Sequence, residues 1–143
     1  MSYKVVYFTR TGTSKRIAEK IANKLSLEAI QITDNMNWKG VLGFIKGGYY
    51  ASRNKPVDIK VAEKFNVTDD LIVVTPLWAG KVAPAIKTFL KTIACDKIHL
   101  VVTSNASNLK DRLEFKSVSD ITKSKNNEDV SVDNIVKSFL LKN

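Results

Sequence analysis

Apolar residues along the chain alternate between two spacings, one typical of buried strands and one typical of helices. A continuous apolar run over 4–8 is followed by residues between 15 and 25 in which the apolar positions recur at helical spacing. Further apolar runs over 28–33, 70–75 and 97–103 have the length and β-branched content of strands. Strands that alternate with helices favour a parallel sheet covered on both faces.

The remaining pattern completes this α/β arrangement. We expect helices over 38–50, where four glycines weaken the pattern, and over 83–93 and 132–141, together with an edge strand over 115–121. Weaker signals indicate short helical turns at 61–65 and 108–113. No internal repeat or linker divides the 143 residues, which we expect to form one domain over 1–143.

Three loops in this arrangement follow the ends of predicted strands. They span 9–14, 76–82 and 104–108, and each contains residues unusual for a simple connection. Ligands of parallel α/β sheets bind at the carboxyl ends of the strands. We therefore expect the three loops to meet at one edge of the sheet.

The first loop carries four hydroxyl residues and one glycine between a strand and a helix. Its sequence from Thr9 is Thr-Arg-Thr-Gly-Thr-Ser, so hydroxyls and backbone N–H groups gather where a helix begins. A helix N-terminus attracts anions, which favours a phosphate site. The alternative is an ordinary N-cap, for which one hydroxyl would suffice.

The second and third loops add an aromatic ring and small polar groups at the same edge. Trp78 follows a buried strand and lies between Pro76 and Gly80, so it can stack on a flat ring, whereas backbone groups of 79–80 and 104–107 can bond to the ring's edge. The alternative for Trp78 is a half-buried core position. Together the three loops predict a site for a phosphorylated heterocycle, which Tyr49 and Tyr50 could border.

Several other chemistries are a poor match to the sequence. Gly12 is the only glycine of the first loop, whereas dinucleotide and P-loop sites require more. Cys95 precedes a strand instead of lying in the anion loop, and His99, the only histidine, lies within a predicted strand. We therefore predict neither a metal site nor a hydrolytic triad, and no catalytic side chain.

The charge of the chain bears on its partners. It carries a net charge of +9 with a pI near 9.7, and its basic residues are scattered without a run of four. This distribution favours an acidic protein partner over nucleic acid. No apolar run approaches the roughly 20 residues that span a bilayer. The single cysteine excludes an internal disulfide, and we expect a cytoplasmic protein.

Two of these loops carry a resemblance to a known family. The segment Thr9-Arg-Thr-Gly-Thr-Ser14 resembles the phosphate loop of flavodoxins, and Pro76-Leu-Trp-Ala-Gly-Lys-Val-Ala-Pro-Ala85 is similar to the ring-binding loop of flavodoxin-like proteins. The segment Thr103-Ser-Asn-Ala-Ser107 falls where their second ring loop lies. The resemblance implies a three-layer sandwich with a five-stranded parallel sheet in the order 2-1-3-4-5 and one non-covalent FMN. The FMN-binding residues that it implies are Thr9, Arg10, Thr11, Gly12, Thr13, Ser14, Pro76, Leu77, Trp78, Ala79, Gly80, Ser104, Asn105, Ala106 and Ser107.

The function that this resemblance implies is electron transfer between proteins through the bound FMN. The flavin would carry the redox chemistry, and the protein would supply binding and electrostatics. Flavodoxins are generally acidic, so the positive charge of this chain points to redox partner proteins that are themselves acidic. Two alternatives stay open: a flavin-dependent oxidoreductase that reduces a quinone or a similar acceptor, and a flavodoxin-shaped interaction module without FMN.

Overall fold

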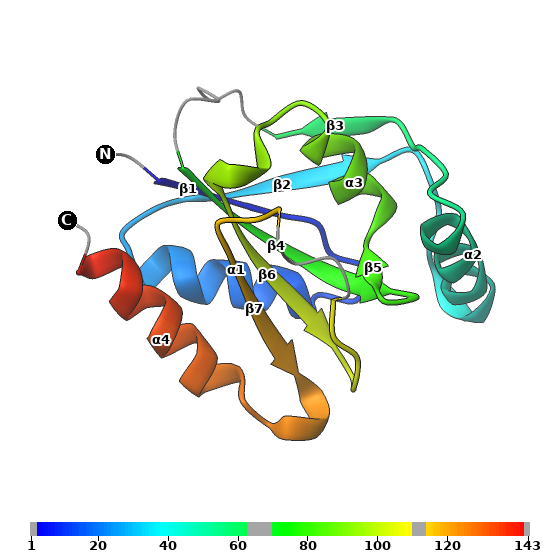
Figure 1. The fold of residues 1–143 in the computed structure, drawn as a ribbon. Coiled ribbons are helices and arrows are strands. Elements are labelled where there is room, and N and C mark those ends of the chain that lie inside the picture. The colour runs from blue at the N-terminus through cyan, green and yellow to red at the C-terminus, as the bar shows by residue number, and fades with distance from the viewer. Residues whose placement is uncertain (1–2, 63–69, 110–113, 142–143) are drawn as a thin grey trace.

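The chain folds around one mixed sheet with helices on both faces (Figure 1). The computed structural model describes residues 3–62, 70–109 and 114–141. Its strands are β1 (Tyr3–Tyr7), β2 (Ala29–Asp34), β3 (Ile59–Val61), β4 (Asp70–Trp78), β5 (Lys81–Val82), β6 (Ile98–Ser104) and β7 (Ser117–Thr122). Its α-helices are α1 (Thr13–Lys24), α2 (Gly40–Ser52), α3 (Pro84–Leu90) and α4 (Glu128–Leu140), and two short 3₁₀ helices are η1 (Cys95–Lys97) and η2 (Lys123–Lys125).

The sheet differs from the predicted one in strand number and direction. It has seven strands in the order β3-β2-β1-β4-β6-β7, with β5 paired to β4. The five strands β2, β1, β4, β6 and β7 run parallel and follow the predicted order, but β3 and β5 add antiparallel pairs. The prediction of a five-stranded, all-parallel sheet is therefore wrong. Strands of two and three residues are too short to give a periodic signal.

Alternation along the central strands divides the core between the two faces of the sheet. Val5 and Tyr7 of β1 pack with Ile17 of α1 and Phe139 of α4 on one face. Val6 packs on the other face, in the cluster that contains the buried residues of α3. Figure 1 shows α1 and α4 together below the sheet, α3 above it, and α2 at the right-hand edge. These are the layers of an α/β sandwich.

The segment 76–82 was predicted as a loop because of its proline and glycine, and the structure corrects this. Strand β4 continues through Pro76, which is opposite Thr103 of β6, as far as Trp78. Ala79 and Gly80 then turn the chain with φ values of 54° and 75°, and Lys81 pairs with Trp78. Two consecutive residues with positive φ are what a tight two-residue hairpin requires.

Other boundaries shift by a few residues. The helix expected over 132–141 begins earlier, at Glu128, because the polar residues before Val132 form its exposed first turn. The predicted helical turn at 61–65 begins within β3, and its residues 63–65 lie outside the described part of the chain, as do 110–113 of the turn expected at 108–113. His99 is buried at the amino end of β6, with Nδ1 2.9 Å from Ser117 Oγ.

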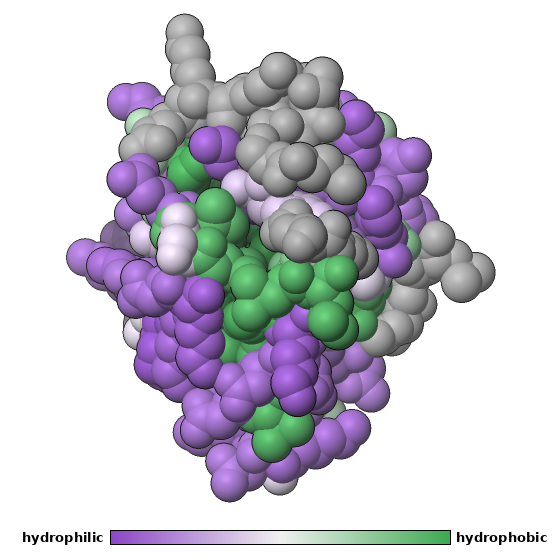
Figure 2. Space-filling model, turned by 90° about the vertical axis from the view of Figure 1, so that its left-hand side faces the viewer, coloured by the Kyte–Doolittle hydropathy of each residue, from purple (hydrophilic) through white to green (hydrophobic). Residues whose placement is uncertain are grey.

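The face that Figure 2 shows, which is the left-hand side of Figure 1, has apolar surface in the middle of the view, bordered by hydrophilic side chains. The carboxyl end of α4, with exposed Leu140 and Leu141, lies toward this side. Among the described residues, no helix has the length and apolar content needed to cross a membrane.

Candidate functional site

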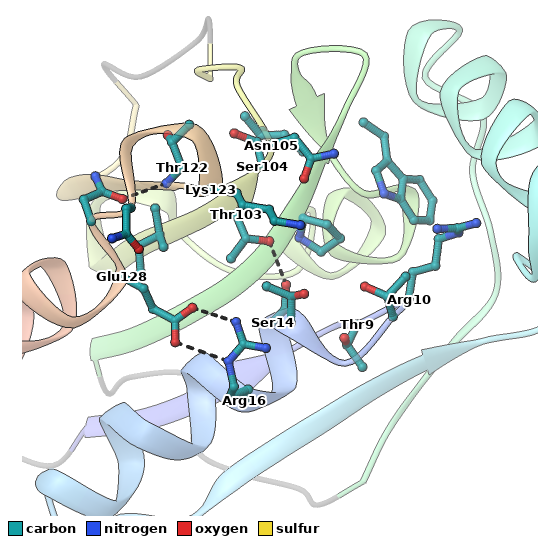
Figure 3. Close-up of a pocket in the computed structure, with 18 of the residues that line it drawn as sticks. Thr9, Arg10, Ser14, Arg16, Thr103, Ser104, Asn105, Thr122, Lys123 and Glu128 are labelled. Carbon is teal, nitrogen blue, oxygen red and sulfur yellow. Dashed lines mark hydrogen bonds and ion pairs between the residues drawn. The ribbon is translucent and has the colours of Figure 1, made fainter.

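A cavity of about 540 Å³ opens at the carboxyl ends of the parallel strands (Figure 3). Residues of all three predicted loops line it: Thr9, Arg10, Thr11, Thr13, Ser14, Pro76, Leu77, Trp78, Ser104 and Asn105. The expectation that the loops meet at one edge of the sheet is therefore confirmed. The other predicted positions, which are Gly12, Ala79, Gly80, Ala106 and Ser107, are not among the residues that line this cavity.

The turn before α1 is shaped by its glycine and its first threonine. Gly12 is the N-cap of α1 and has a φ of 101°, a left-handed conformation that favours glycine. Its N–H donates to Thr9 Oγ1 at 2.9 Å, which closes the turn. Because glycine caps the helix, the hydroxyl residues Thr11 and Thr13 are left to line the cavity. The capping alternative accounts for none of the four hydroxyls.

Ser14 has a structural role within the site. Its hydroxyl is almost fully buried and lies 3.1 Å from Thr103 Oγ1, at the end of β6. Figure 3 shows this contact joining the first turn of α1 to the neighbouring strand. The pair holds the start of α1 against the sheet, so the backbone N–H groups of the first turn face the cavity from a fixed place.

Arg10 points away from the centre of the turn and binds to α2. Its Nε donates to the Trp38 carbonyl and its Nη2 donates to the Gly40 carbonyl, both at 2.8 Å. The guanidinium lies 5.7 Å from the centre of the Phe44 ring. Arg10 therefore joins the hydroxyl turn to the start of α2, and its charge remains at the wall of the cavity.

Trp78 belongs to an aromatic cluster and also forms part of the cavity wall. Its ring meets Phe8 and Trp38 edge to face, with centroid distances of 5.7 and 5.1 Å. It is half-buried and lines the cavity between the hydroxyl turn and α2. The half-buried position that was the alternative for Trp78 is therefore what the structure shows, whereas its contact with a bound ring stays a prediction.

The loop after β6 is held closed by its own side chain. Ser104 Oγ donates to the Ser107 carbonyl at 2.6 Å and accepts from the Ser107 N–H at 3.1 Å. The Asn105 carbonyl accepts from Ser124 N at 2.9 Å, which ties the loop to η2. Ser104 and Asn105 therefore present a fixed polar edge to the cavity, and Ser107 serves to close the turn.

The sequence analysis missed part of the wall. The additional lining residues are Arg16, Phe44, Thr103, Ile121, Thr122, Lys123, Asn126, Asn127 and Glu128. Six of these nine lie between Ile121 and Glu128, from the end of β7 through η2 to the start of α4. The carboxyl end of the fifth parallel strand must lie at the same edge as the others. The polar segment that follows it was therefore the signal that could have found them.

The additional wall contains a buried hydroxyl, that of Thr122, without a hydrogen-bond partner among the described residues. Thr122 is 2% exposed, and its N–H donates to Asn127 Oδ1. A buried hydroxyl without a partner costs free energy unless a ligand or water satisfies it. This hydroxyl lies beneath the cavity wall, where its unmet hydrogen bond disfavours the arrangement of the wall seen here.

Charge at the cavity is arranged around Glu128. Arg16 Nη2 lies 2.6 Å from Glu128 Oε1, and Lys20 Nζ lies 2.6 Å from Oε2. The Arg16 hydrogen bond, opposed by partial burial and supported by Lys20, lowers the pKa of Glu128 from 4.5 to about 2. The carboxylate is thus charged at neutral pH and compensated by its two cations, while Arg10 and Lys123 add positive charge to the wall.

A second cavity of about 300 Å³ lies on the far side of the hairpin. Gly80, Lys81, Lys87 and Cys95 are among its lining residues. Lys81 and Lys87 both donate to Asn54 Oδ1, at 3.3 and 2.6 Å. The prediction grouped Gly80 with the ring-binding loop, but in this structure it borders this second cavity instead.

Comparison with known proteins finds similarity in structure only. No family model matches the chain, and no curated protein sequence matches it. A flavoprotein of Lactobacillus acidophilus NCFM, solved in complex with FMN, is 17% identical with a TM-score of 0.64, covering 85% of this chain and 90% of that one. A protein of Bacteroides eggerthii DSM 20697, provisionally described as a flavoprotein, is 18% identical with a TM-score of 0.69, covering 96% of each chain. The chain therefore has the fold of these flavoproteins.

Proposed function

We propose that this protein binds FMN non-covalently in the 540 Å³ cavity and transfers electrons between proteins. The observation that carries the proposal is the meeting of the hydroxyl turn, Trp78 and the Ser104–Asn105 edge around one cavity. Its volume is within the range of small-molecule sites. The structurally similar flavoprotein of Lactobacillus acidophilus, which was solved with FMN, supports the choice of ligand.

The residues present fit the parts of such a ligand. The N–H groups at the start of α1 and the hydroxyls of Thr11 and Thr13 would hold the phosphate. Trp78 would lie against the ring, and Ser104 and Asn105 would bond to its polar edge. When bound, FMN supplies the redox chemistry, so no side-chain acid or base is required.

Binding can be tested by titrating the purified chain with FMN and following its absorbance and fluorescence. We expect saturation at one FMN per chain, and weaker binding of riboflavin, which lacks the phosphate. Thr11→Val with Thr13→Val should weaken FMN binding about tenfold or more but change riboflavin binding little. Ser107→Ala is the matched control, because this serine is outside the cavity wall.

Three outcomes would count against parts of the proposal. No uptake of FMN would overturn it and favour the interaction module. Equal affinity for FMN and riboflavin would overturn the assignment of the phosphate to the hydroxyl turn. Steady oxidation of NADH or NADPH with a quinone by the loaded protein would replace electron transfer between proteins by the oxidoreductase alternative.

A further inference from the structure

Helix α2 has an inverted arrangement of small and large residues. Gly43, Gly47 and Ala51 recur every four residues and form its buried face. Its large apolar residues face outward instead: Val41 is 76% exposed, Leu42 80%, Phe44 66% and Ile45 61%. A surface helix normally buries its large apolar residues. Here the glycine face is against the protein.

Close packing explains why the helix cannot turn its other face inward. A Cβ at Gly43 would lie 2.0 Å from the carbonyl carbon and oxygen of Trp38, and one at Gly47 would lie 3.0 Å from the Trp78 ring. Only small residues fit along this contact. The outward position of Val41, Leu42 and Ile45 therefore follows from the way α2 is seated.

The segment that carries this apolar face is basic. Residues 35–57 contain Lys39, Lys46, Arg53 and Lys55 and no Asp or Glu. Lys55 Nζ and the Arg53 guanidinium lie 4.9 and 5.9 Å from the centre of the Tyr49 ring, so these cations stand at the edge of the aromatic surface.

The exposed apolar residues of α2 and the cations near them indicate what kind of partner could bind there. An exposed apolar patch marks a binding surface, and the basic surround calls for a negatively charged partner. A second copy of this chain would bring the same cations together, which disfavours self-association. Exposed aliphatic side chains along one helix, followed by Arg53 and Lys55, are also the layout of an interfacial helix, whose apolar residues enter the acyl region while its cations meet the headgroup phosphates.

We propose that the outer face of α2 docks on an anionic membrane surface. The helix of 13 residues, about 20 Å long, would lie along the interface with Val41, Leu42 and Ile45 in the acyl region and the flanking cations at the phosphates. Phe44 is on this helix and also lines the 540 Å³ cavity, so the cavity opens beside the docking surface. Docking does not depend on the proposed FMN function.

Co-sedimentation with vesicles tests the proposal on the full chain without added FMN. We expect binding to phosphatidylcholine mixed with about one-third phosphatidylglycerol, and at least tenfold less binding to phosphatidylcholine alone. Raising the salt from about 0.05 M to about 0.5 M should weaken binding several-fold, because the attraction to the headgroups is screened. Equal binding to both kinds of vesicle, or to neither, would overturn it.

Paired variants place the binding on α2. Leu42→Asn with Ile45→Asn should reduce binding to the anionic vesicles about tenfold or more, because both side chains leave the acyl region. Leu141→Asn makes the same change at an exposed leucine on the other side of the molecule and should leave binding unchanged. Circular dichroism and FMN titration check that the variants remain folded.

Three further results would contradict the proposal. An α2-dependent dimer in light scattering, with no vesicle binding, would identify a second copy as the occupant. A vesicle-inactive chain that instead binds a purified acidic protein through Leu42 and Ile45 would identify a protein partner. Loss of vesicle binding in Leu141→Asn to the same degree would show that the surface is elsewhere.

Discussion

The hydroxyl oxygens of Ser14 and Thr103 lie 3.1 Å apart in the interior, at the point where α1 begins and β6 ends. Both residues are buried, so neither hydroxyl can exchange this contact freely for water. The contact sets the position of the first turn of α1, on which the proposed phosphate site depends.

Ser14→Ala should therefore lower the free energy of unfolding by about 1–3 kcal/mol, because the buried Thr103 hydroxyl loses this partner. Urea unfolding measures the change. Adding Thr103→Val should recover part of the loss, since both polar groups are then absent. Strictly additive effects of the two substitutions would show that the two hydroxyls do not interact.

The ion pairs of Glu128 predict a pH dependence of stability. The pKa of Glu128 is lowered from 4.5 to about 2 in the folded chain, so its contribution is present above pH 4.5 and is lost as the pH falls toward 2. Glu128→Gln should remove about 1 kcal/mol at neutral pH and flatten the fall in stability over this interval. Urea unfolding at a series of pH values measures the free energy of unfolding of both proteins across this interval.

Asp133→Asn is the matched control for Glu128→Gln. The exposed Asp133 pairs with Lys24 between the same two helices at 2.6 Å, and this hydrogen bond lowers its pKa. Solvent screens this pair, so its removal should change the pH dependence less. A profile for Glu128→Gln that matches that of the unsubstituted chain would contradict the assigned role of Glu128.

The β4–β5 turn contains a strained residue. Ala79 has a φ of 54°, in the left-handed region that side chains with a Cβ disfavour. Ala79→Gly should raise the free energy of unfolding by about 0.5–1 kcal/mol, and Gly80→Ala should lower it by about 1 kcal/mol. Thermal unfolding compares the two, and a loss of stability in Ala79→Gly would show that this turn is unstrained.

The glycines of α2 should respond oppositely to the same substitution. Gly43→Ala places a Cβ 2.0 Å from the Trp38 backbone and should destabilise the chain by about 3 kcal/mol or more, because neither helix nor backbone can yield freely. Gly48 has no neighbour within 4 Å of an added Cβ, so Gly48→Ala should stabilise the helix by about 0.5–1 kcal/mol. Thermal unfolding measures both changes. Similar effects of the two substitutions would contradict the close contact of α2 with the Trp38 backbone.

The sequence predicted the edge at which the site lies better than it predicted the complete wall. Strand ends at Phe8, Thr75 and Thr103 were visible in the apolar pattern, and their loops do meet at one cavity. The extension of β4 through Pro76 was not visible, because it depends on pairing with β6, far along the chain. Local composition indicated a loop there.

Individual side-chain roles were also outside the reach of the sequence. Arg10 was expected among the FMN-binding residues and does line the cavity, but the sequence did not show that its guanidinium binds carbonyls 28 and 30 residues away. The outward face of α2 could not be predicted either, because the apolar stripe of a surface helix normally packs against the protein. Which face of a helix is buried depends on the space available, and here only glycine fits against Trp38.

The two hydrogen bonds of Arg10 give the hydroxyl turn and the start of α2 a common anchor. A ligand bound at one of these two elements changes the affinity at the other only if it shifts the position of the anchor that they share. Each ligand then changes the affinity for the other by the same factor. We therefore expect FMN in the cavity and vesicles at α2 each to change the affinity for the other by the same factor, although each binds alone. Arg10→Gln should bring this factor closer to one.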